Sequence, residues 1–158
     1  LFLYRKLHGL SYMVLRYPNV YGPRQTPHGE AGVVAIFTGL LLAGKPCTIF
    51  GDGSKTRDYV FIEDVVQANL LALESDYNGI LNIGSGIGTS DQQVYEAVAA
   101  AVGSSLKPIY AAVRPGEVMH ICLDAARARK ILGWQPRVPF AEGVQQTVRY
   151  IRAQTKGQ

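Results

Sequence analysis

Glycines mark the ends of four predicted helices and therefore fix how this chain is divided. Glycine adopts the left-handed backbone conformation without steric cost, so it ends helices more readily than other residues do. Short apolar segments that suit strands lie between the helical stretches, for example Cys47–Phe50 and Ile80–Ile83. Helices that alternate with short strands predict one mixed α/β domain. The four glycines are Gly9, Gly44, Gly103 and Gly133.

Hydrophobic periodicity and end signals predict the individual elements. The predicted strands cover residues 11–16, 47–50, 56–62, 80–83 and 107–112. The predicted helices end at His8 or cover residues 33–43, 63–74, 90–102 and 124–132, and a last helix presents Phe140, Val144, Val148 and Ile151 on one face. Ser90 and Gln93 have the spacing of a capping box, and Asp124 is the predicted cap of the short helix. Residues 17–32 are predicted to be a loop, which at this length is usually functional.

The composition excludes several classes of protein. A chain of 158 residues that is 47% hydrophobic and 18% charged can bury a core and is not of disordered composition. No apolar run approaches the ~20 residues of a membrane helix. Cys47 and Cys122 have no disulfide or zinc spacing and are predicted to be buried thiols, which fits a reducing, cytoplasmic compartment. His8, His28 and His120 lack metal-ligand spacing, so we predict no metal site and expect all three at the surface.

The net charge of +4 allows three kinds of anionic target: nucleic acid, an acidic lipid surface or a small phosphorylated ligand. The bases form no block of like charge, and they neither gather on one helix nor alternate with aromatic residues. Neither a nucleic acid nor a membrane is therefore the predicted partner.

Two arginines in different segments are candidates for binding an anion. Arg57 lies inside a predicted strand and Arg114 lies in a predicted loop. If the two converge, their guanidinium groups can bind a diphosphate, because a guanidinium matches phosphate oxygens bidentately. The alternative for Arg57 is a structural ion pair with a carboxylate such as Asp64. Asn19 in turn either holds a turn through its own side chain or presents its amide to a ligand.

The glycine-rich segment Gly84–Gly88 follows a predicted strand and precedes a helix. It is not a dinucleotide-binding fingerprint, because its third glycine comes too early and no acidic residue follows at the usual distance. Two interpretations remain open: the loop approaches a ligand closely, or it is a plain tight turn.

Five segments in order resemble one family over essentially the whole chain. They are residues 15–25 (LRYPNVYGPRQ), 46–65 (PCTIFGDGSKTRDYVFIEDV), 82–90 (NIGSGIGTS), 114–117 (RPGE) and 132–136 (LGWQP). They resemble the C-terminal part of extended short-chain dehydrogenases/reductases, in particular the UDP-glucose 4-epimerase and NAD-dependent nucleotide-sugar epimerase/dehydratase family. The resemblance implies the substrate-binding part of a Rossmann-type α/β fold without its N-terminal nucleotide-binding half.

The resemblance also implies roles for eleven residues. For the cofactor NAD, it implies backbone contacts at the nicotinamide end from Tyr17 and Pro18. For the diphosphate of a UDP-sugar, it implies Asn19, Arg57 and Arg114. For the nucleoside, it implies a uridine pocket at Thr48, Ile49 and Phe50, a backbone contact at Val33, a nucleotide contact at Asp91, and Glu117 on the ribose hydroxyls.

The resemblance, aligned through residues 16–19, places the family's catalytic tyrosine and lysine, spaced Tyr-x-x-x-Lys, upstream of Leu1. Tyr4 cannot replace that tyrosine, because the residue four positions after it is His8. We therefore expect a single UDP-sugar-binding domain, residues 1–158, truncated at its N-terminus, with further sequence upstream of Leu1 and without epimerase activity by itself. In the complete enzyme the implied reaction is NAD-dependent oxidation at sugar C4, rotation of the keto sugar and re-reduction. The alternatives are a stand-alone UDP-sugar-binding module and an interaction module that assembles as a homo-oligomer, such as a dimer, through exposed apolar surface.

Overall fold

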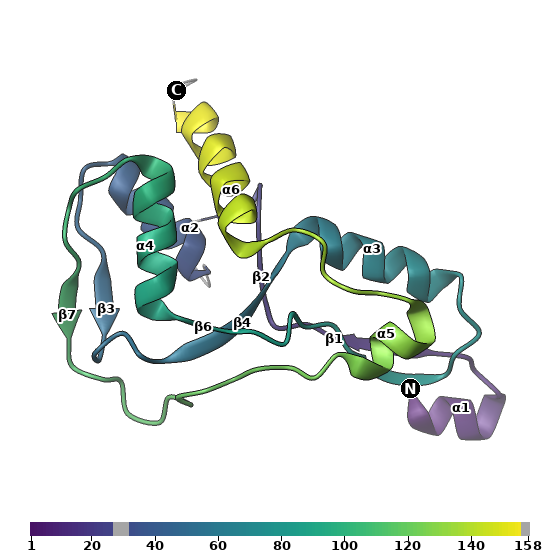
Figure 1. Ribbon diagram of the computed structural model, residues 1–158. Coiled ribbons are helices and arrows are strands. Elements are labelled where there is room, and N and C mark those ends of the chain that lie inside the picture. The colour runs from purple at the N-terminus through teal and green to yellow at the C-terminus, as the bar shows by residue number, and fades with distance from the viewer. Residues whose placement is uncertain (27–31, 156–158) are drawn as a thin grey trace.

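The computed structural model of the chain describes residues 1–26 and 32–155, and helices alternate with strands as expected (Figure 1). The helices are α1 (Phe2–His8), α2 (Val33–Leu42), α3 (Ile62–Leu73), α4 (Asp91–Val102), α5 (Ala126–Leu132) and α6 (Phe140–Thr155). The strands are β1 (Met13–Arg16), β2 (Asn19–Tyr21), β3 (Thr48–Phe50), β4 (Thr56–Phe61), β5 (Gly79–Asn82), β6 (Gly88–Ser90) and β7 (Ile109–Ala111). No helix in these described residues is long and apolar enough to cross a membrane.

The strands form three small sheets, and β4 is the longest strand. β1 pairs with β5 and β3 pairs with β7, both in parallel. β4 lies between β2, which runs parallel to it, and β6, which runs antiparallel. In this sheet Asn19 lies opposite Tyr59, and Arg57 lies opposite Thr89.

Strand β4 contributes to two separate hydrophobic cores. The first core packs α2, α4 and α6 together and contains Tyr59 and Phe61. The second core packs α3 and α5 against β5 and contains Val60. Successive side chains of a strand point to opposite faces, so one strand can serve both cores. Figure 1 shows α2, α4 and α6 in the left part of the molecule and α3 and α5 in the right part.

The local signals at helix ends are confirmed. Gly9, Gly103 and Gly133 adopt the left-handed conformation, with φ of 68°, 76° and 64°, directly after α1, α4 and α5. Gly44 has φ of 69° one residue after the cap of α2. The capping box of α4 is present, because the Gln93 amide donates to Ser90 Oγ (3.1 Å) and the Ser90 amide donates to Gln93 Oε1 (2.8 Å).

The predicted loop over residues 17–32 is wrong in part, because Asn19–Tyr21 form strand β2. Residues 88–90, the last of which is the N-cap Ser90, likewise form strand β6. Both segments are strands because their main chains bond to β4, which is distant in sequence. His28 and the rest of residues 27–31 lie outside the described residues.

Three smaller expectations concern the cap of α5, the two cysteines and the histidines. The carboxylate of Asp124 accepts from the amide of Ala126 at 2.8 Å, but the capping residue of α5 is Ala125. Cys47 is buried as expected, whereas Cys122 is exposed, so its predicted burial is wrong. His120 is exposed, as is His8.

The carboxylate of Asp58 explains the glycine-rich loop. Asp58 is fully buried on β4, and its oxygens accept from the Ser85 amide (2.9 Å), the Ser85 hydroxyl (2.5 Å), the Gly86 amide (3.2 Å) and the Leu123 amide (3.1 Å). A Cβ at Gly84 would lie 2.6 Å from both Asp58 Oδ2 and Leu123 Cβ. The loop is therefore a tight turn around a carboxylate, and its amides at Ser85 and Gly86 are used within the protein.

We expect Asp58→Asn to lower the free energy of unfolding by about 2–4 kcal/mol, because the substituted amide group would face N–H donors that then lack a buried acceptor. Urea denaturation measures this loss. Asp76→Asn changes an exposed aspartate in the same way and should alter the free energy by less than about 0.5 kcal/mol. Equal urea midpoints for the two variants would contradict the role of Asp58.

Candidate functional site

A cavity of about 430 Å³ lies where β3, β4 and α2 meet the first residue of α4 and the segment between β7 and α5. One part of its wall is apolar and comes from α2 and β3, and the other part is charged. Its lining residues are Asn19, Val33, Ile36, Phe37, Leu40, Thr48, Ile49, Phe50, Lys55, Arg57, Tyr59, Asp91, Arg114 and Glu117.

The cavity brings together nine of the eleven residues expected at a site. These are the nine expected to bind the substrate: Asn19, Val33, Thr48, Ile49, Phe50, Arg57, Asp91, Arg114 and Glu117. The other two, Tyr17 and Pro18, are not among the lining residues and lie in the connection between β1 and β2. The Tyr17 hydroxyl donates to Asn69 Oδ1 at 2.9 Å.

Arg57 reaches the cavity from β4. Its Nη1 donates to the carbonyl of Thr56 (2.8 Å) and to that of Met119 (3.4 Å). The alternative of an Arg57–Asp64 ion pair is wrong, because the Asp64 carboxylate accepts instead from the amides of Arg137 (2.9 Å) and Val138 (3.2 Å). Asp64 belongs to α3, where its buried carboxylate fixes the chain that leads into α6.

Arg114 reaches the cavity from the segment between β7 and α5. Its guanidinium carbon lies 3.9 Å from the centre of the Phe50 ring, which is a cation–π arrangement. Phe50 is the last residue of β3, so the stack places the guanidinium beside the apolar part of the wall. The side chains of Arg57 and Arg114 therefore share one cavity although 57 positions separate them in the sequence.

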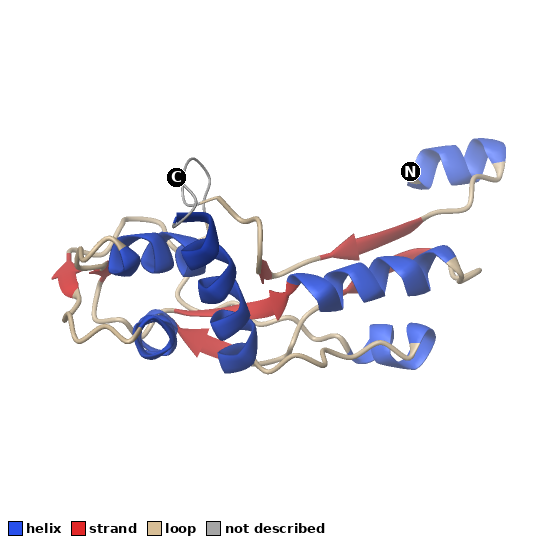
Figure 2. Ribbon diagram, turned by 90° about the horizontal axis from the view of Figure 1, so that it is seen from above, coloured by secondary structure: helices blue, strands red, loops and turns tan. Residues whose placement is uncertain are grey.

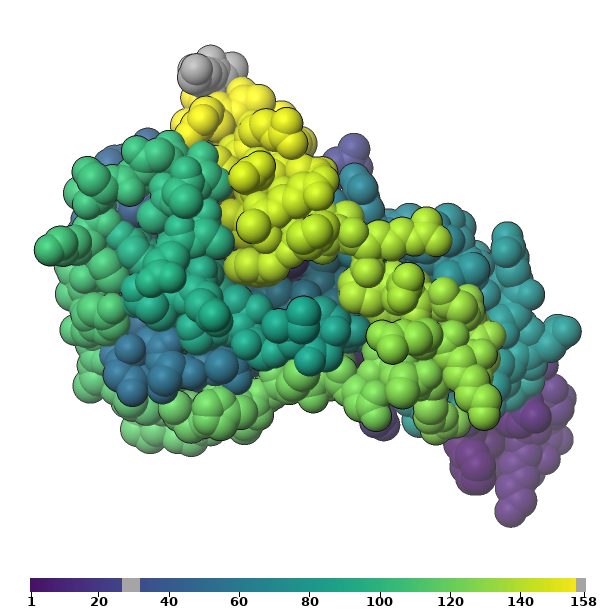
Figure 3. All heavy atoms as spheres, in the orientation of Figure 1, coloured from purple at the N-terminus to yellow at the C-terminus, as the bar shows by residue number. Residues whose placement is uncertain are grey.

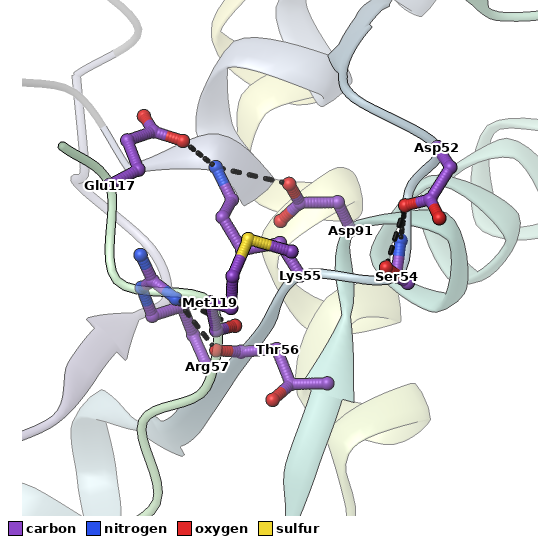
Figure 4. A network of polar contacts seen from close by, with 8 residues as sticks. All are labelled: Asp52, Ser54, Lys55, Thr56, Arg57, Asp91, Glu117 and Met119. Atoms are coloured by element: carbon purple, nitrogen blue, oxygen red, sulfur yellow. Dashed lines mark hydrogen bonds and ion pairs between the residues drawn. The ribbon is translucent and has the colours of Figure 1, made fainter. Parts of the chain in front are cut away.

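Lys55 is a lining residue that our sequence interpretation missed. Its Nζ lies 2.7 Å from Glu117 Oε2 and 3.3 Å from Asp91 Oδ2, between two carboxylates from different segments (Figure 4). The signal for it was the period of two in the extended segment: Lys55, Arg57 and Tyr59 point to one side and all line the cavity. Our sequence interpretation did not use this period and missed Tyr59 as well.

The charges in the cavity affect each other's protonation. The pKa of Glu117 is lowered, first by the hydrogen bond from Lys55 and then by the positive charges of Lys55, Arg114 and Arg57. Burial raises the pKa of Tyr59, and the negative charge of Asp91 raises it further, so its phenol stays protonated. The wall therefore presents a charged carboxylate at Glu117 and a neutral phenol at Tyr59 at neutral pH.

Residues 1–84, more than half of the 158, match the sequence profile of the NAD dependent epimerase/dehydratase family. The chain belongs to this family. Its resemblance to a UDP-glucose 4-epimerase of Mycolicibacterium smegmatis extends over 95% of the chain at 49% identity, but over 48% of that relative.

Solved structures of the NAD dependent epimerase/dehydratase family confirm the fold. The crystal structure of a UDP-glucose 4-epimerase from Thermotoga maritima with UDP-glucose superposes with a TM-score of 0.94 at 48% identity and covers 97% of this chain and 50% of that one. The Thermus thermophilus UDP-glucose 4-epimerase complex with NAD gives a TM-score of 0.86 at 44% identity, with 95% of this chain and 49% of that one covered. The chain thus has part of an extended short-chain dehydrogenase fold and spans about half the length of these relatives.

The family is NAD dependent, but the glycine-rich loop in the described part of this chain does not offer its amides to the phosphates of a dinucleotide. The glycine-rich loop has its amides at Ser85 and Gly86 bonded to Asp58. The contacts implied at Tyr17 and Pro18 are two backbone positions outside the cavity.

The lowered pKa of Glu117 predicts how stability depends on pH. The charged form is favoured in the folded state, so the stabilisation is complete above the ordinary value of 4.5 and is lost as the pH falls through the lowered pKa. We expect the acid-induced fall of the melting temperature to be less steep in Glu117→Gln than in the wild type. Thermal melts between about pH 3 and pH 6 measure this. In the control Glu74→Gln, at an exposed residue, the melting temperature should depend on pH as it does in the wild type. The same pH dependence in Glu117→Gln would show that the pair with Lys55 does not contribute to stability.

Proposed function

We propose that this chain is the UDP-sugar-binding part of a UDP-glucose 4-epimerase-like protein and that the ligand occupies the cavity between β3 and β4. The observation that carries the proposal is the presence of Arg57 and Arg114, from distant segments, on the wall of one cavity. The resemblance to a solved epimerase whose structure holds UDP-glucose supports it.

The diphosphate is bound at the charged end of the cavity. Arg57 and Arg114 each offer a planar set of N–H donors that suits phosphate oxygens, and the Asn19 amide at the start of β2 adds a neutral donor. Arg57 already uses one nitrogen on main-chain carbonyls, which fixes the side chain before the ligand arrives.

The nucleoside is bound at the apolar end. Uracil lies against strand β3, at Thr48, Ile49 and Phe50, with Val33 of α2 touching it through the backbone. The remaining α2 residues on the wall exclude water from the base. Glu117 accepts hydrogen bonds from the ribose hydroxyls, because a charged carboxylate is a strong acceptor. Asp91, the first residue of α4, contacts the nucleotide beside it.

The family supports a proposal for the activity of the whole protein. We propose a cytoplasmic isomerase that uses NAD to oxidise sugar C4 and to reduce it again from the other face. Tyr17 and Pro18 contact the nicotinamide end of the cofactor through their backbone. The role of the 158 residues in this reaction is to bind and orient the sugar nucleotide, because the family's Tyr-x-x-x-Lys pair is not among them.

We expect UDP to bind to the purified chain in isothermal titration calorimetry, and Arg57→Ala to weaken the affinity by about 10- to 100-fold, because charge-assisted hydrogen bonds to phosphate are lost. Arg57→Lys retains the charge without the bidentate geometry and should fall in between. The control Arg149→Ala, at an exposed residue of α6, should bind UDP as the wild type does. Unchanged affinity in Arg57→Ala would place the diphosphate elsewhere.

Exposed apolar side chains favour a second proposal, that the chain is an interaction module that forms homo-oligomers. Helix α1 has no buried residue and projects from the rest of the molecule (Figures 2 and 3). Its Phe2 and Leu7 are 72% and 64% exposed, and Leu73 at the end of α3 is 84% exposed. Apolar surface of this extent favours association.

We expect light scattering to give the mass of a dimer or larger species for the wild type, and a smaller mass for the double variant Phe2→Ser/Leu7→Ser, which removes apolar surface without touching a core. Lys6→Ser changes an exposed polar residue of the same helix and should leave the mass unchanged. A monomeric wild type at high protein concentration would contradict the interaction module and leave the UDP-sugar site untouched.

A further inference from the structure

The ion pairs of Lys55 have a consequence for the cavity that extends the proposed function and rests on it. We propose that Lys55 is a positioning residue: it holds Glu117 and Asp91 away from Arg57 and Arg114, so that both guanidinium groups remain available to the phosphates of the ligand. Lys55 itself need not touch the ligand in this role.

Lys55 joins three segments of the chain at the cavity wall. It lies directly before β4, Asp91 begins α4, and Glu117 belongs to the segment between β7 and α5. The main chain supports the arrangement, because the amide of Asp91 donates to the carbonyl of Lys55 at 3.0 Å. The side chains of Lys55, Asp91 and Glu117 are only 15%, 12% and 25% exposed, so the ion pairs are partly shielded from solvent.

The formal charges of the side chains that line the cavity nearly cancel. Lys55 supplies the charge that makes their sum positive. The cations are Lys55, Arg57 and Arg114, and the anions are Asp91 and Glu117, which leaves one net positive charge. Without Lys55 the net charge of the wall is zero. A neutral wall attracts the negatively charged diphosphate less than a positive wall does. A cavity of one sign attracts a ligand of the other, so the loss of this charge weakens binding by a small part that is the same in both Glu117 backgrounds.

Glu117 competes for the same arginines that the ligand needs. Its carboxylate interacts with the positive charges of Arg114 and Arg57 as well as with Lys55. Glu117 also closes a turn with Arg114, to whose carbonyl its amide donates at 3.5 Å, and Gly116 has φ of 81° in this turn. If Lys55 is removed, the cations left to Glu117 are the two guanidinium groups, and a pair with either one takes N–H donors from the phosphates.

A direct contact between Lys55 and a phosphate would also make Lys55 important for binding, but with a different pattern of effects. In a direct contact, the loss caused by Lys55→Met is independent of Glu117. In the positioning role, the loss depends on the carboxylate and shrinks when Glu117 carries no charge. A double-mutant cycle separates the two cases.

The experiment measures UDP and uridine affinities by calorimetry for the wild type, Lys55→Met, Glu117→Gln and the double variant. We expect Lys55→Met to weaken UDP binding by about tenfold or more in the wild-type background and by less than about threefold in the Glu117→Gln background. Uridine lacks phosphates and keeps only the ribose contact of Glu117, so its affinity should fall by a clearly smaller factor than that of UDP in Lys55→Met. Lys45→Met, at an exposed lysine, is the matched control and should leave both affinities unchanged.

Two further variants exclude a mere loss of folding. Lys55→Gln keeps a hydrogen-bond donor without the charge and should lose UDP affinity as Lys55→Met does, while Lys55→Arg keeps the charge and should stay within about threefold of the wild type. Urea denaturation shows whether each variant is folded. If Lys55→Met does not fold, the cycle is built with Lys55→Gln instead.

Three results would overturn the inference. One is unchanged UDP affinity in folded Lys55→Met and Lys55→Gln, and another is an equal loss in both Glu117 backgrounds, which indicates direct contact with phosphate. The third is an equal loss for UDP and uridine, which indicates a structural role. A wild type that fails to bind UDP is a separate outcome, because it removes the proposed function and the inference with it.

Discussion

The convergence of the two arginines depends on how the segment between β7 and α5 is tied to β4. Near the end of this segment, the main-chain amide of Leu123 donates to the buried carboxylate of Asp58 on β4. Further along, Thr56 pairs with the segment through its main chain: its amide donates to Met119 (2.9 Å) and its carbonyl accepts from Ile121 (3.2 Å). These bonds fix the segment that carries Arg114 alongside the strand that carries Arg57. Without these hydrogen bonds, the segment with Arg114 would not be held beside β4, and the two guanidinium groups would not share the cavity.

The features that the sequence could predict are those decided within a few residues. Helix ends at Gly9 and Gly103 and the capping box at Ser90 depend on neighbouring backbone groups, and the structure contains all three. Strands β2 and β6 were missed because each is a strand only through its bonds to β4, which no local pattern reveals. Tertiary pairing overrides local propensity in such short segments.

The residues of the candidate site were predicted from the family resemblance and not from spacing alone. The resemblance named the nine residues that the cavity brings together, whereas spacing alone favoured a structural ion pair of Arg57 with a carboxylate such as Asp64. That alternative failed because Asp64 is used by main-chain amides at the start of another segment. Lys55 escaped notice because an isolated lysine has no motif, and its importance lies in carboxylates contributed by segments far away.

The alternation of β4 limits how this chain can change during evolution. Lys55, Arg57 and Tyr59 face the cavity, whereas Asp58 and Val60 between them serve the glycine turn and the second core. A change of side chain at one position alters one of these tasks. An insertion or deletion of a single residue in the strand exchanges the two sets and places charges in the core. The length of β4 is therefore constrained more strictly than its composition.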